Sequence, residues 1–402
     1  MSTKDIAEGT YEAQAPTVGA AEDLAIYIHW PFCLSKCPYC DFNSHVRDEV
    51  DHPKWRAALL KNLEHWSGLA PKRRVTSIFF GGGTPSLMDP ATAAALIDQV
   101  SEYWHVDDGV EITLEANPTS VEAGRLVDFR AAGVNRISLG IQALDDRALL
   151  FLGRNHSARE AIKAIELADH LFDRFSFDLI YARPEQTIAA WREELARALT
   201  LAGDHISVYQ LTIEAGTAFH ARKQRGELET LDDATTAALF EETQAALETA
   251  GLPAYEISNH ARPGSECSHN LTYWRYGDYA GIGPGAHGRL TSQGDKHAYR
   301  QARGPEAWLH AVEKQGRGMV EAQYLTNTER FEEMMMMGLR LTEFVPTDRI
   351  EREAQTRLDL AVDPDRLNGL VDGGFLELGV KGLRATAAGR QRLDAVLAQL
   401  LV

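Results

Sequence analysis

Short apolar runs alternate with amphipathic segments from Leu24 to about Ile257. Strands that alternate with helices of about 10 to 15 residues are typical of βαβ units and a parallel sheet. Because crossovers are right-handed, such units wind one way round, so the pattern predicts an α/β fold with a partial or full (β/α) barrel. The predicted strands are Leu24–His29, Val75–Phe80, Glu111–Ala116, Arg136–Ile141, Phe175–Tyr181, His205–Leu211 and Pro253–Ile257. The predicted helices between them include Pro53–Trp66, Thr92–Trp104, Val121–Ala132, Ala158–Leu171 and Ile188–Leu201.

The pattern changes after the last of these strands. Residues 268–288 are rich in aromatic residues, glycine and histidine, and beyond about Tyr299 the alternation of strands and helices stops. A helix, a short hairpin and a final helix then predict a small winged-helix-like module. We therefore expect a disordered tail over residues 1–20, a barrel over 21–260, a connecting segment over 261–300 and a C-terminal helical module over 301–402. The predicted elements of this module are Arg330–Leu341, Pro346–Gln355, Arg366–Val371, Gly373–Leu378, Leu383–Ala385 and Thr386–Leu400.

Charge narrows the choice of partners. The chain of 402 residues carries a formal net charge of −17, whereas phosphate contacts need a basic surface. The C-terminal module, where a DNA-binding winged helix would lie, has ten Lys and Arg against thirteen Asp and Glu over residues 326–402. We therefore expect no nucleic-acid partner, and a packing or lid role for this module.

Two further features bear on location. The N-terminal residues lack the basic start and apolar core of a signal peptide, and no run reaches the ~18 apolar residues of a membrane span. The expected compartment is the cytoplasm, and any contact with membrane proteins would be peripheral.

Three of the four cysteines lie in one short run, Cys33, Cys37 and Cys40, with the spacing CxxxCxxC. Pro38 favours an extended conformation at Cys37, so the run reads as a loop. Three thiolates can hold three irons of a cubic [4Fe–4S] cluster, whose usual site has four cysteines, and one iron then stays open for another ligand. Zinc would need His29, His45 or Asp41 to complete a set without standard spacing, and an odd number of thiols argues against disulfides.

Other polar motifs follow the predicted strands at the carboxyl ends, where a (β/α) barrel builds its site. The cysteine loop follows the first strand, the run 81–85 (Gly-Gly-Gly-Thr-Pro) follows the second, and Asn117-Pro118 follows the third. Three glycines let the backbone approach a ligand closely, although such a run also serves as an ordinary tight turn. Single polar residues near strand ends together form a plausible cradle for a zwitterionic nucleoside: Glu115, Gln142, Arg154 and Asp178.

The motifs at 27–42, 81–85, 114–118, 138–142 and 178–181 together resemble those of radical S-adenosylmethionine (SAM) proteins. More narrowly, the chain is similar to the oxygen-independent coproporphyrinogen oxidase (HemN) family, in its haem-chaperone branch. The resemblance implies that Cys33, Cys37 and Cys40 bind a [4Fe–4S] cluster and that the amino and carboxylate groups of SAM bind its open iron. It also implies SAM contacts from Tyr27, Tyr39, Gly82, Gly83, Thr84, Glu115, Gln142, Arg154 and Asp178. One departure lies beside Asp178, where Ala182-Arg183-Pro184 replaces the Gly-Leu-Pro of the family.

Two features favour the haem-chaperone branch. The oxidase pattern carries a further cysteine where this chain has Phe42. Residues 269–274 match the HNxxYW signature of the haem-binding branch, which implies haem contacts from His269, Asn270, Tyr273 and Trp274. Histidine can ligate haem iron, and the two aromatic rings offer flat apolar surface to a macrocycle. In the alternative interpretation, His269 and Asn270 bind no haem and only hold a loop over the barrel mouth.

Three other groups invite a ligand interpretation. Cys267 could be a haem thiolate but is more typical of an inert buried thiol, and His287 could be a ligand but fits a turn histidine better. The run Met334–Met337 contains soft sulfur, yet consecutive methionines point around a helix and are typical of core filling.

These features together predict a protein that binds a [4Fe–4S] cluster, SAM and haem and delivers haem to acceptor haemoproteins. The alternative is an enzyme that decarboxylates coproporphyrinogen III through a SAM-derived radical, an activity that Phe42 makes unexpected. A cluster-dependent DNA-binding regulator is the third possibility, and the charge of the C-terminal module argues against it. The sequence assigns no catalytic residue and leaves open whether SAM is cleaved.

Overall fold

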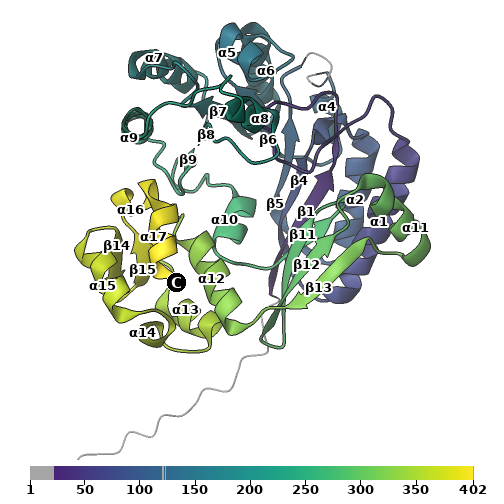
Figure 1. The fold of residues 1–402 in the computed structure, drawn as a ribbon. Helices are drawn as coiled ribbons and strands as arrows, with labels where there is room; N and C mark the ends of the chain where they lie inside the picture. Colours follow the sequence, from purple (N-terminus) through teal and green to yellow (C-terminus); the bar gives the residue numbers. More distant parts are fainter. Residues whose placement is uncertain (1–21, 120–121, 123, 402) are drawn as a thin grey trace, which may run out of the picture.

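The computed structural model describes residues 22–119, 122 and 124–401 (Figure 1). The tail predicted over residues 1–20 lies outside this part. The described residues form one 11-stranded sheet in the order β13-β12-β11-β10-β1-β4-β5-β6-β7-β8-β9. The strands of this sheet are β1 Asp23–Trp30, β4 Arg74–Gly82, β5 His105–Ala116, β6 Arg136–Gln142, β7 Arg174–Tyr181, β8 His205–Gln210, β9 Asn259–Ala261, β10 Tyr279–Ile282, β11 His287–Ser292, β12 Asp295–Gln301 and β13 Met319–Tyr324.

The centre of the sheet is parallel, from β10 through β1 to β8. Its strands are largely buried, as in sheets that are covered on both faces; β1, for example, buries six of its eight residues. Helices alternate with these strands, so the predicted α/β partial barrel is confirmed. The covering helices and turns are α1 His52–Leu69, η1 Pro85–Leu87, α2 Pro90–Tyr103, α4 Leu126–Ala131, α5 Asp146–Phe151, α6 Ala158–Leu171, α7 Ile188–Leu199, α8 Ala218–Gln224, α9 Asp233–Thr249 and α11 Pro305–Gln315.

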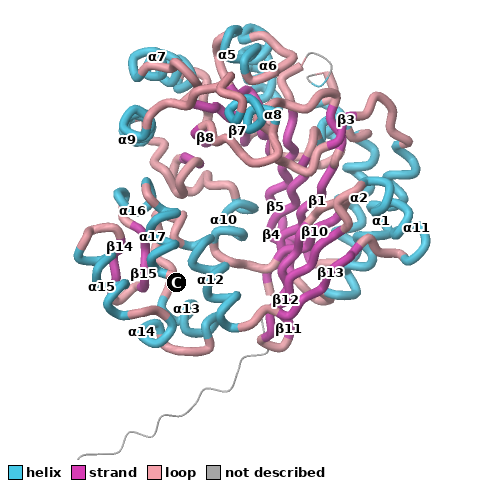
Figure 2. Tube along the Cα trace, in the orientation of Figure 1, coloured by secondary structure: helices cyan, strands magenta, loops and turns pink. Residues whose placement is uncertain are grey.

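Side-chain caps explain where several helices begin. Ser157 and Glu160 form a capping box at the start of α6, and the Asp89 side chain accepts the Ala91 N–H at the start of α2. The predicted helix over 121–132 is described as α4 over its second half, and residues 121 and 123 lie outside the described part. Figure 2 shows α1, α2 and α11 together on one side of the sheet.

The sheet continues beyond the alternating region. The strand predicted over 253–257 is wrong, because the chain turns there and the strand is Asn259–Ala261, which runs antiparallel to β8. The Glu256 side chain accepts the N–H of Ser258 and the amide of Asn259, which closes this turn. Strands β10 to β13 were not predicted, and β11 to β13 are antiparallel. The predicted boundaries at 260 and 300 therefore fall inside one continuous sheet.

A separate hydrophobic core defines the C-terminal module. Met334 and Met335 are fully buried in it, which confirms core filling for these two, while Met336 is 42% exposed. The module lies on the side of the sheet opposite α1, α2 and α11, against α10, the helix Ser268–Trp274 (Figure 1). Its elements are α12 Asn327–Gly338, α13 Thr347–Ala354, α14 Leu358–Ala361, α15 Pro364–Asp372, β14 Leu376–Gly379, β15 Gly382–Ala385, α16 Ala387–Gln391 and α17 Leu393–Leu400.

Buried ion pairs fix the module in place. Arg340 donates to the carboxylate of Glu256, which is fully buried, and Arg289 on β11 pairs with Glu333 on α12 at 2.7 Å. Because a buried charge without its partner costs about 3–5 kcal/mol, these contacts fix how α12 faces the sheet.

Candidate functional site

The cysteine loop leaves β1 at the carboxyl edge of the sheet, as predicted. Cys33 ends the short strand β2 (Phe32–Cys33), which pairs with β3 (His45–Val46) and so closes the loop on itself. The N–H of Arg47 donates to the Cys33 carbonyl at 3.1 Å, and the N–H of Phe219 in α8 donates to that of Pro38 at 2.9 Å. The loop is therefore held at both its base and its tip.

The glycine turn after β4 packs directly against this loop. The N–H of Gly83 donates to the Trp30 carbonyl at 2.7 Å, and the N–H of Thr84 donates to that of Phe32 at 2.9 Å. A Cβ atom at Gly83 would lie 2.8 Å from the Phe32 oxygen and 3.0 Å from the Cys33 sulfur. Only glycine permits this approach, so the turn serves to position the cysteine loop.

The three cysteines line one cavity of about 440 Å³. Among residues 22–119, 122 and 124–401, no three His, Cys, Asp or Glu side chains are arranged to hold a single metal ion. In a zinc site every thiolate lies about 2.3 Å from one ion, whereas cysteines of an iron–sulfur cube bind separate irons.

Hydrogen-bond donors surround the cysteine sulfurs. The Thr84 hydroxyl donates to the Cys33 sulfur at 3.3 Å, and the Arg154 guanidinium donates to the Cys37 sulfur at 3.2 Å. Arg154 also donates to the Asn117 side chain and to the Gly140 carbonyl at 2.8 Å, which fixes its plane. Such donors stabilise thiolates, the form that ligates iron.

Two acids on the wall of this cavity, Glu115 and Asp178, form no ion pair among the described residues. Burial, with Asp178 nearby, raises the pKa of the Glu115 carboxyl to about 8, and burial raises the pKa of Asp178 to about 6. The N–H of Gly82 donates to Glu115 at 3.2 Å. Both acids line the cavity, so a cationic or hydroxyl-bearing ligand would restore their ordinary ionisation.

Gln142 is a second sign of a missing ligand. Its backbone has φ of 72°, a left-handed conformation that costs a non-glycine residue about 1 kcal/mol. Its Oε1 atom is buried without a hydrogen-bond partner among the described residues. A strained residue that faces the cavity with an unpaired acceptor fits the amine or hydroxyl groups of a SAM-like molecule.

The predicted SAM residues do not all share this cavity. Tyr39, Gly82, Gly83, Thr84, Glu115, Gln142, Arg154 and Asp178 line it. Tyr27 instead lines a neighbouring cavity, where its hydroxyl donates to Nδ1 of His29 at 3.0 Å. The departure near Asp178 leaves that side chain in place: Ala182 adopts φ of 57°, and Arg183 is buried in an ion pair with Glu194.

The neighbouring cavity has a volume of about 690 Å³ and lies between α10, α12 and strands β10 to β12. Its wall is rich in aromatic rings and includes three arginines. Phe42, Gly82 and Glu115 line both cavities, so the two adjoin. The aromatic residues of the wall are Tyr27, Phe42, Tyr273, Trp274, Tyr276 and Tyr279, and the arginines are Arg289, Arg300 and Arg303.

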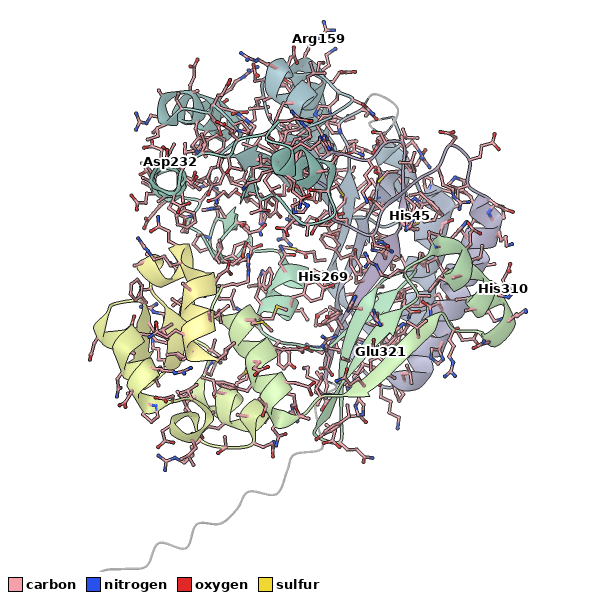
Figure 3. The ribbon with its side chains drawn as sticks, in the orientation of Figure 1. His45, Arg159, Asp232, His269, His310 and Glu321 are labelled. Atoms are coloured by element: carbon pink, nitrogen blue, oxygen red, sulfur yellow. The ribbon has the colours of Figure 1, made fainter. Side chains whose placement is uncertain are left out.

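The four named residues of the HNxxYW motif occupy two different settings: two of them anchor α10, and the other two line the 690 Å³ cavity. His269 is buried on α10, facing the sheet (Figure 3), with Nδ1 bonded to Ser77 at 2.9 Å and Nε2 bonded to Tyr273 at 2.8 Å. Burial lowers its pKa to about 3. Asn270 donates to the Tyr255 hydroxyl at 3.3 Å, so His269 and Asn270 anchor the helix. Tyr273 and Trp274 line the 690 Å³ cavity, so these two are placed for ligand contact and His269 is not.

Cys267 and His287 lie in different settings. Cys267 is fully buried before α10 and donates to Glu111 at 3.3 Å, and burial raises its thiol pKa to about 12, which agrees with an inert thiol. His287 begins strand β11 and is exposed to the 690 Å³ cavity. It is therefore a strand residue, and the expected turn is wrong.

Sequence reasoning missed several residues of the two cavities. Asn117, within a motif that was recognised, joins Arg154 to Thr84 by bonding both. Arg300 and Arg303 gave no signal, because charged residues in an unpredicted strand and its following loop look like ordinary surface. His29 was considered only as a zinc ligand, yet its ring is held by Tyr27 and the Asn43 carbonyl.

Comparison with known proteins gives the class first. Residues 27–220 match the model of the radical SAM superfamily, and residues 325–392 match the HemN C-terminal domain. The fold agrees with the solved structure of coproporphyrinogen III oxidase (HemN) from Escherichia coli, at a TM-score of 0.79 and 22% identity over 94% of this chain and 90% of that chain. The barrel and cysteine loop thus define a radical SAM protein, a class that implies a [4Fe–4S] cluster and SAM.

Curated relatives give the branch. The chain is 39% identical to heme chaperone HemW of Escherichia coli over 93% of this chain and 97% of that protein. It is 40% identical to the mitochondrial radical S-adenosyl methionine domain-containing protein 1 of Bos taurus over 98% of this chain and 91% of that protein. The chain belongs to the HemN-like family of the radical SAM superfamily, in the haem-chaperone branch. Within the described residues, no helix has the length and hydrophobicity needed to cross a membrane.

Proposed function

We propose that this protein is a haem chaperone, which binds a [4Fe–4S] cluster, SAM and haem and passes haem to acceptor haemoproteins. The observation that carries the proposal is the 690 Å³ cavity beside the cysteine cavity, with its aromatic wall and its arginines. Aromatic rings suit the flat apolar face of a macrocycle, and guanidinium groups suit its carboxylates. The volume lies within the range of about 300–1,000 Å³ typical of ligand sites.

In this proposal Cys33, Cys37 and Cys40 hold the cluster, and the residues of the 440 Å³ cavity hold SAM. The cluster and SAM supply one-electron chemistry when they are bound. The role of the chain is to position them. Arg154 and Thr84 stabilise cysteine thiolates, and Glu115, Asp178 and Gln142 offer acceptors to the ligand.

Phe42 favours haem handling over porphyrinogen oxidation. It stands where the oxidase pattern has a further cysteine, is 60% exposed, and lines both cavities. An apolar ring at that junction offers contact surface but no ligand or proton. Cys267, the remaining cysteine, is buried behind α10 and lines neither cavity.

The test is an anaerobic haem titration of the cluster-reconstituted protein, beside a turnover assay with SAM, reductant and coproporphyrinogen III. We expect saturable haem binding and no protoporphyrinogen. Trp274→Ala should weaken haem binding about tenfold, equivalent to ~1.4 kcal/mol, because a wall aromatic is lost. Tyr324→Ala is the matched control, since Tyr324 is 49% exposed on the edge strand β13 and outside the cavity. Turnover of the porphyrinogen without haem binding would support the oxidase instead.

A further inference from the structure

Pairing in the sheet gathers one histidine and two arginines on one face. His287 and Arg289 are two residues apart on β11, so their side chains leave the same face of the sheet. Arg300 on β12 pairs directly with His287 across the ladder and therefore shares that face. All three line the 690 Å³ cavity, and Arg303 joins them from the loop that follows β12.

Two histidines line this cavity, His29 and His287, and of these only His287 has a ring without a hydrogen-bond partner among the described residues. The His29 ring is bonded at both nitrogens, to the Tyr27 hydroxyl and the Asn43 carbonyl, each at 3.0 Å. His269 is also bonded at both nitrogens and lies behind Tyr273. His287 lines the cavity, is exposed to it, and makes no side-chain hydrogen bond within the described part of the chain.

Charged side chains from β11, β12, β13 and α12 surround the His287 imidazole. Burial, with Arg289, Arg300 and Arg303 nearby, lowers its pKa, and Glu321 opposes this. The carboxylate of Glu321, on the neighbouring strand β13, is paired with Arg300 (Figure 3). Two more titratable groups lie around the ring: Glu333, paired with Arg289, and His29. A neutral imidazole offers a free lone pair to iron.

The three arginines differ in how much charge they have to offer. Arg289 is neutralised by Glu333 at 2.7 Å, and Arg300 pairs with Glu321 at 2.7 Å in an exposed ion pair. The Arg303 guanidinium has no carboxylate within ion-pair distance among the described residues. Its backbone is fixed instead, because the Asn43 side chain donates to its carbonyl at 3.0 Å and to that of Pro284 at 3.0 Å. A guanidinium without an ion-pair partner, carried by a fixed backbone at the rim of an apolar cavity, is suited to a ligand carboxylate.

We propose that His287 would ligate the haem iron and that Arg303, with Arg300 beside it, would bind the haem propionates. Tyr273 and Trp274, which line the same cavity, would offer the macrocycle apolar surface. This inference rests on the proposed haem-binding function and replaces His269 by His287 as the ligating histidine. Helix α10, which carries the HNxxYW residues, then forms a wall of the site, and its own histidine, His269, is structural.

The first test is haem titration followed by absorption and resonance Raman spectra of the ferric, ferrous and ferrous–CO forms. His287→Gly should remove the histidine–iron signature and weaken haem binding at least tenfold. Added free imidazole should restore the signature in this variant, which a purely structural role of His287 would not allow. His310→Gly is the control, because His310 is exposed on α11 away from the cavity (Figure 3). If His310→Gly lowers the temperature of unfolding but leaves the haem spectra unchanged, loss of stability alone does not explain the loss of the ligand signature in His287→Gly.

The second test separates propionate recognition from the macrocycle. Arg303→Gln should weaken binding of haem about tenfold and leave binding of haem dimethyl ester, which lacks the carboxylate charges, unchanged. Arg317→Gln should change neither, since Arg317 is an exposed arginine in the loop before β13.

The outcomes also distinguish the two proposals. If the wild type takes up no haem, the chaperone function fails. If the wild type binds haem but His287→Gly keeps the wild-type spectra and affinity, or Tyr279→Phe alone removes the ligand signature, the assignment of His287 is overturned while the chaperone function stands.

Discussion

Gly83→Ala is the substitution that most directly tests how the glycine turn positions the cysteine loop. The added Cβ would lie 2.8 Å from the carbonyl oxygen of Phe32, 2.9 Å from the carbonyl carbon of Pro31 and 3.0 Å from the sulfur of Cys33. All three distances are below the 3.4 Å at which ordinary contact begins. Two of the contacted atoms belong to the backbone, so no side-chain rotation can relieve them and the loop itself must move.

Forced overpacking of this kind costs about 1–3 kcal/mol in the free energy of unfolding. The sulfur of Cys33 must move as well, and metal sites tolerate only ~0.2 Å of deviation in ligand distance. We therefore expect the variant to keep about half or less of the wild-type iron after anaerobic reconstitution, in addition to the lower stability of its cluster-free form.

Iron and sulfide content together with denaturant unfolding measure both effects. Gly68→Ala is the matched control, because a Cβ at this exposed position of α1 would meet nothing within 4 Å. The control should keep its iron and gain about 0.5–1 kcal/mol, the usual gain from alanine within a helix. Wild-type iron content and stability in Gly83→Ala would refute the close packing of the turn against the loop.

Three further predictions follow from single contacts. Cys40→Ser should abolish reconstitution of the cluster, whereas Cys267→Ser should retain full iron content, since its hydroxyl can still donate to Glu111; equal iron in both variants would contradict the cluster assignment. The buried neutral His269 has a pKa of about 3 against ~6.5 in the unfolded chain, so it stabilises the fold above pH ~6.5 and that stability is lost as the pH falls toward 3. The pH slope of the unfolding free energy in His269→Gln should therefore be shallower by about 1.4 kcal/mol per pH unit between pH ~6 and ~4, and an unchanged slope would contradict burial of the neutral ring. Arg340→Met should cost about 3 kcal/mol and speed proteolysis of the C-terminal module, because fully buried Glu256 loses its ion pair, while Arg357→Met, from an exposed pair with Asp359, should cost less than about 1 kcal/mol.

The sequence predicted the parallel half of the fold because its strands are buried on both faces. Strand β4, for example, reads as an apolar run that ends in the glycine turn, and its bounds agree with the prediction to within two residues. Strand β10 escaped notice because its apolar run is only four residues long. Strands β11 to β13 do not form apolar runs: five of the six residues of β13 are exposed. The strand predicted near residue 255 failed because the buried Glu256 carboxylate organises a turn, a contact that depends on Arg340 far along the chain.

The residues of the candidate site were also only partly predictable from the sequence. The cysteine loop, the glycine turn and Glu115 were predictable, because each lies at or directly after the carboxyl end of a recognisable strand. For His269 the sequence left a ligand role and a structural role open, because its partners, Ser77 and Tyr273, come together only when α10 packs on β4. Likewise, the pairing of β11 with β12 is what places His287 beside Arg300.

The most direct test of the chaperone proposal is the transfer of haem from the loaded protein to an apo-haemoprotein. Wild-type protein with its cluster reconstituted should be loaded with one equivalent of haem, freed of excess, and mixed with the apo-acceptor while the acceptor spectrum is recorded. The proposal predicts that the acceptor spectrum develops faster than when the same concentration of haem is supplied bound to albumin. It also predicts that the chaperone returns to its haem-free form. Haem that stays on the protein, or that reaches the acceptor no faster than from albumin, would contradict it.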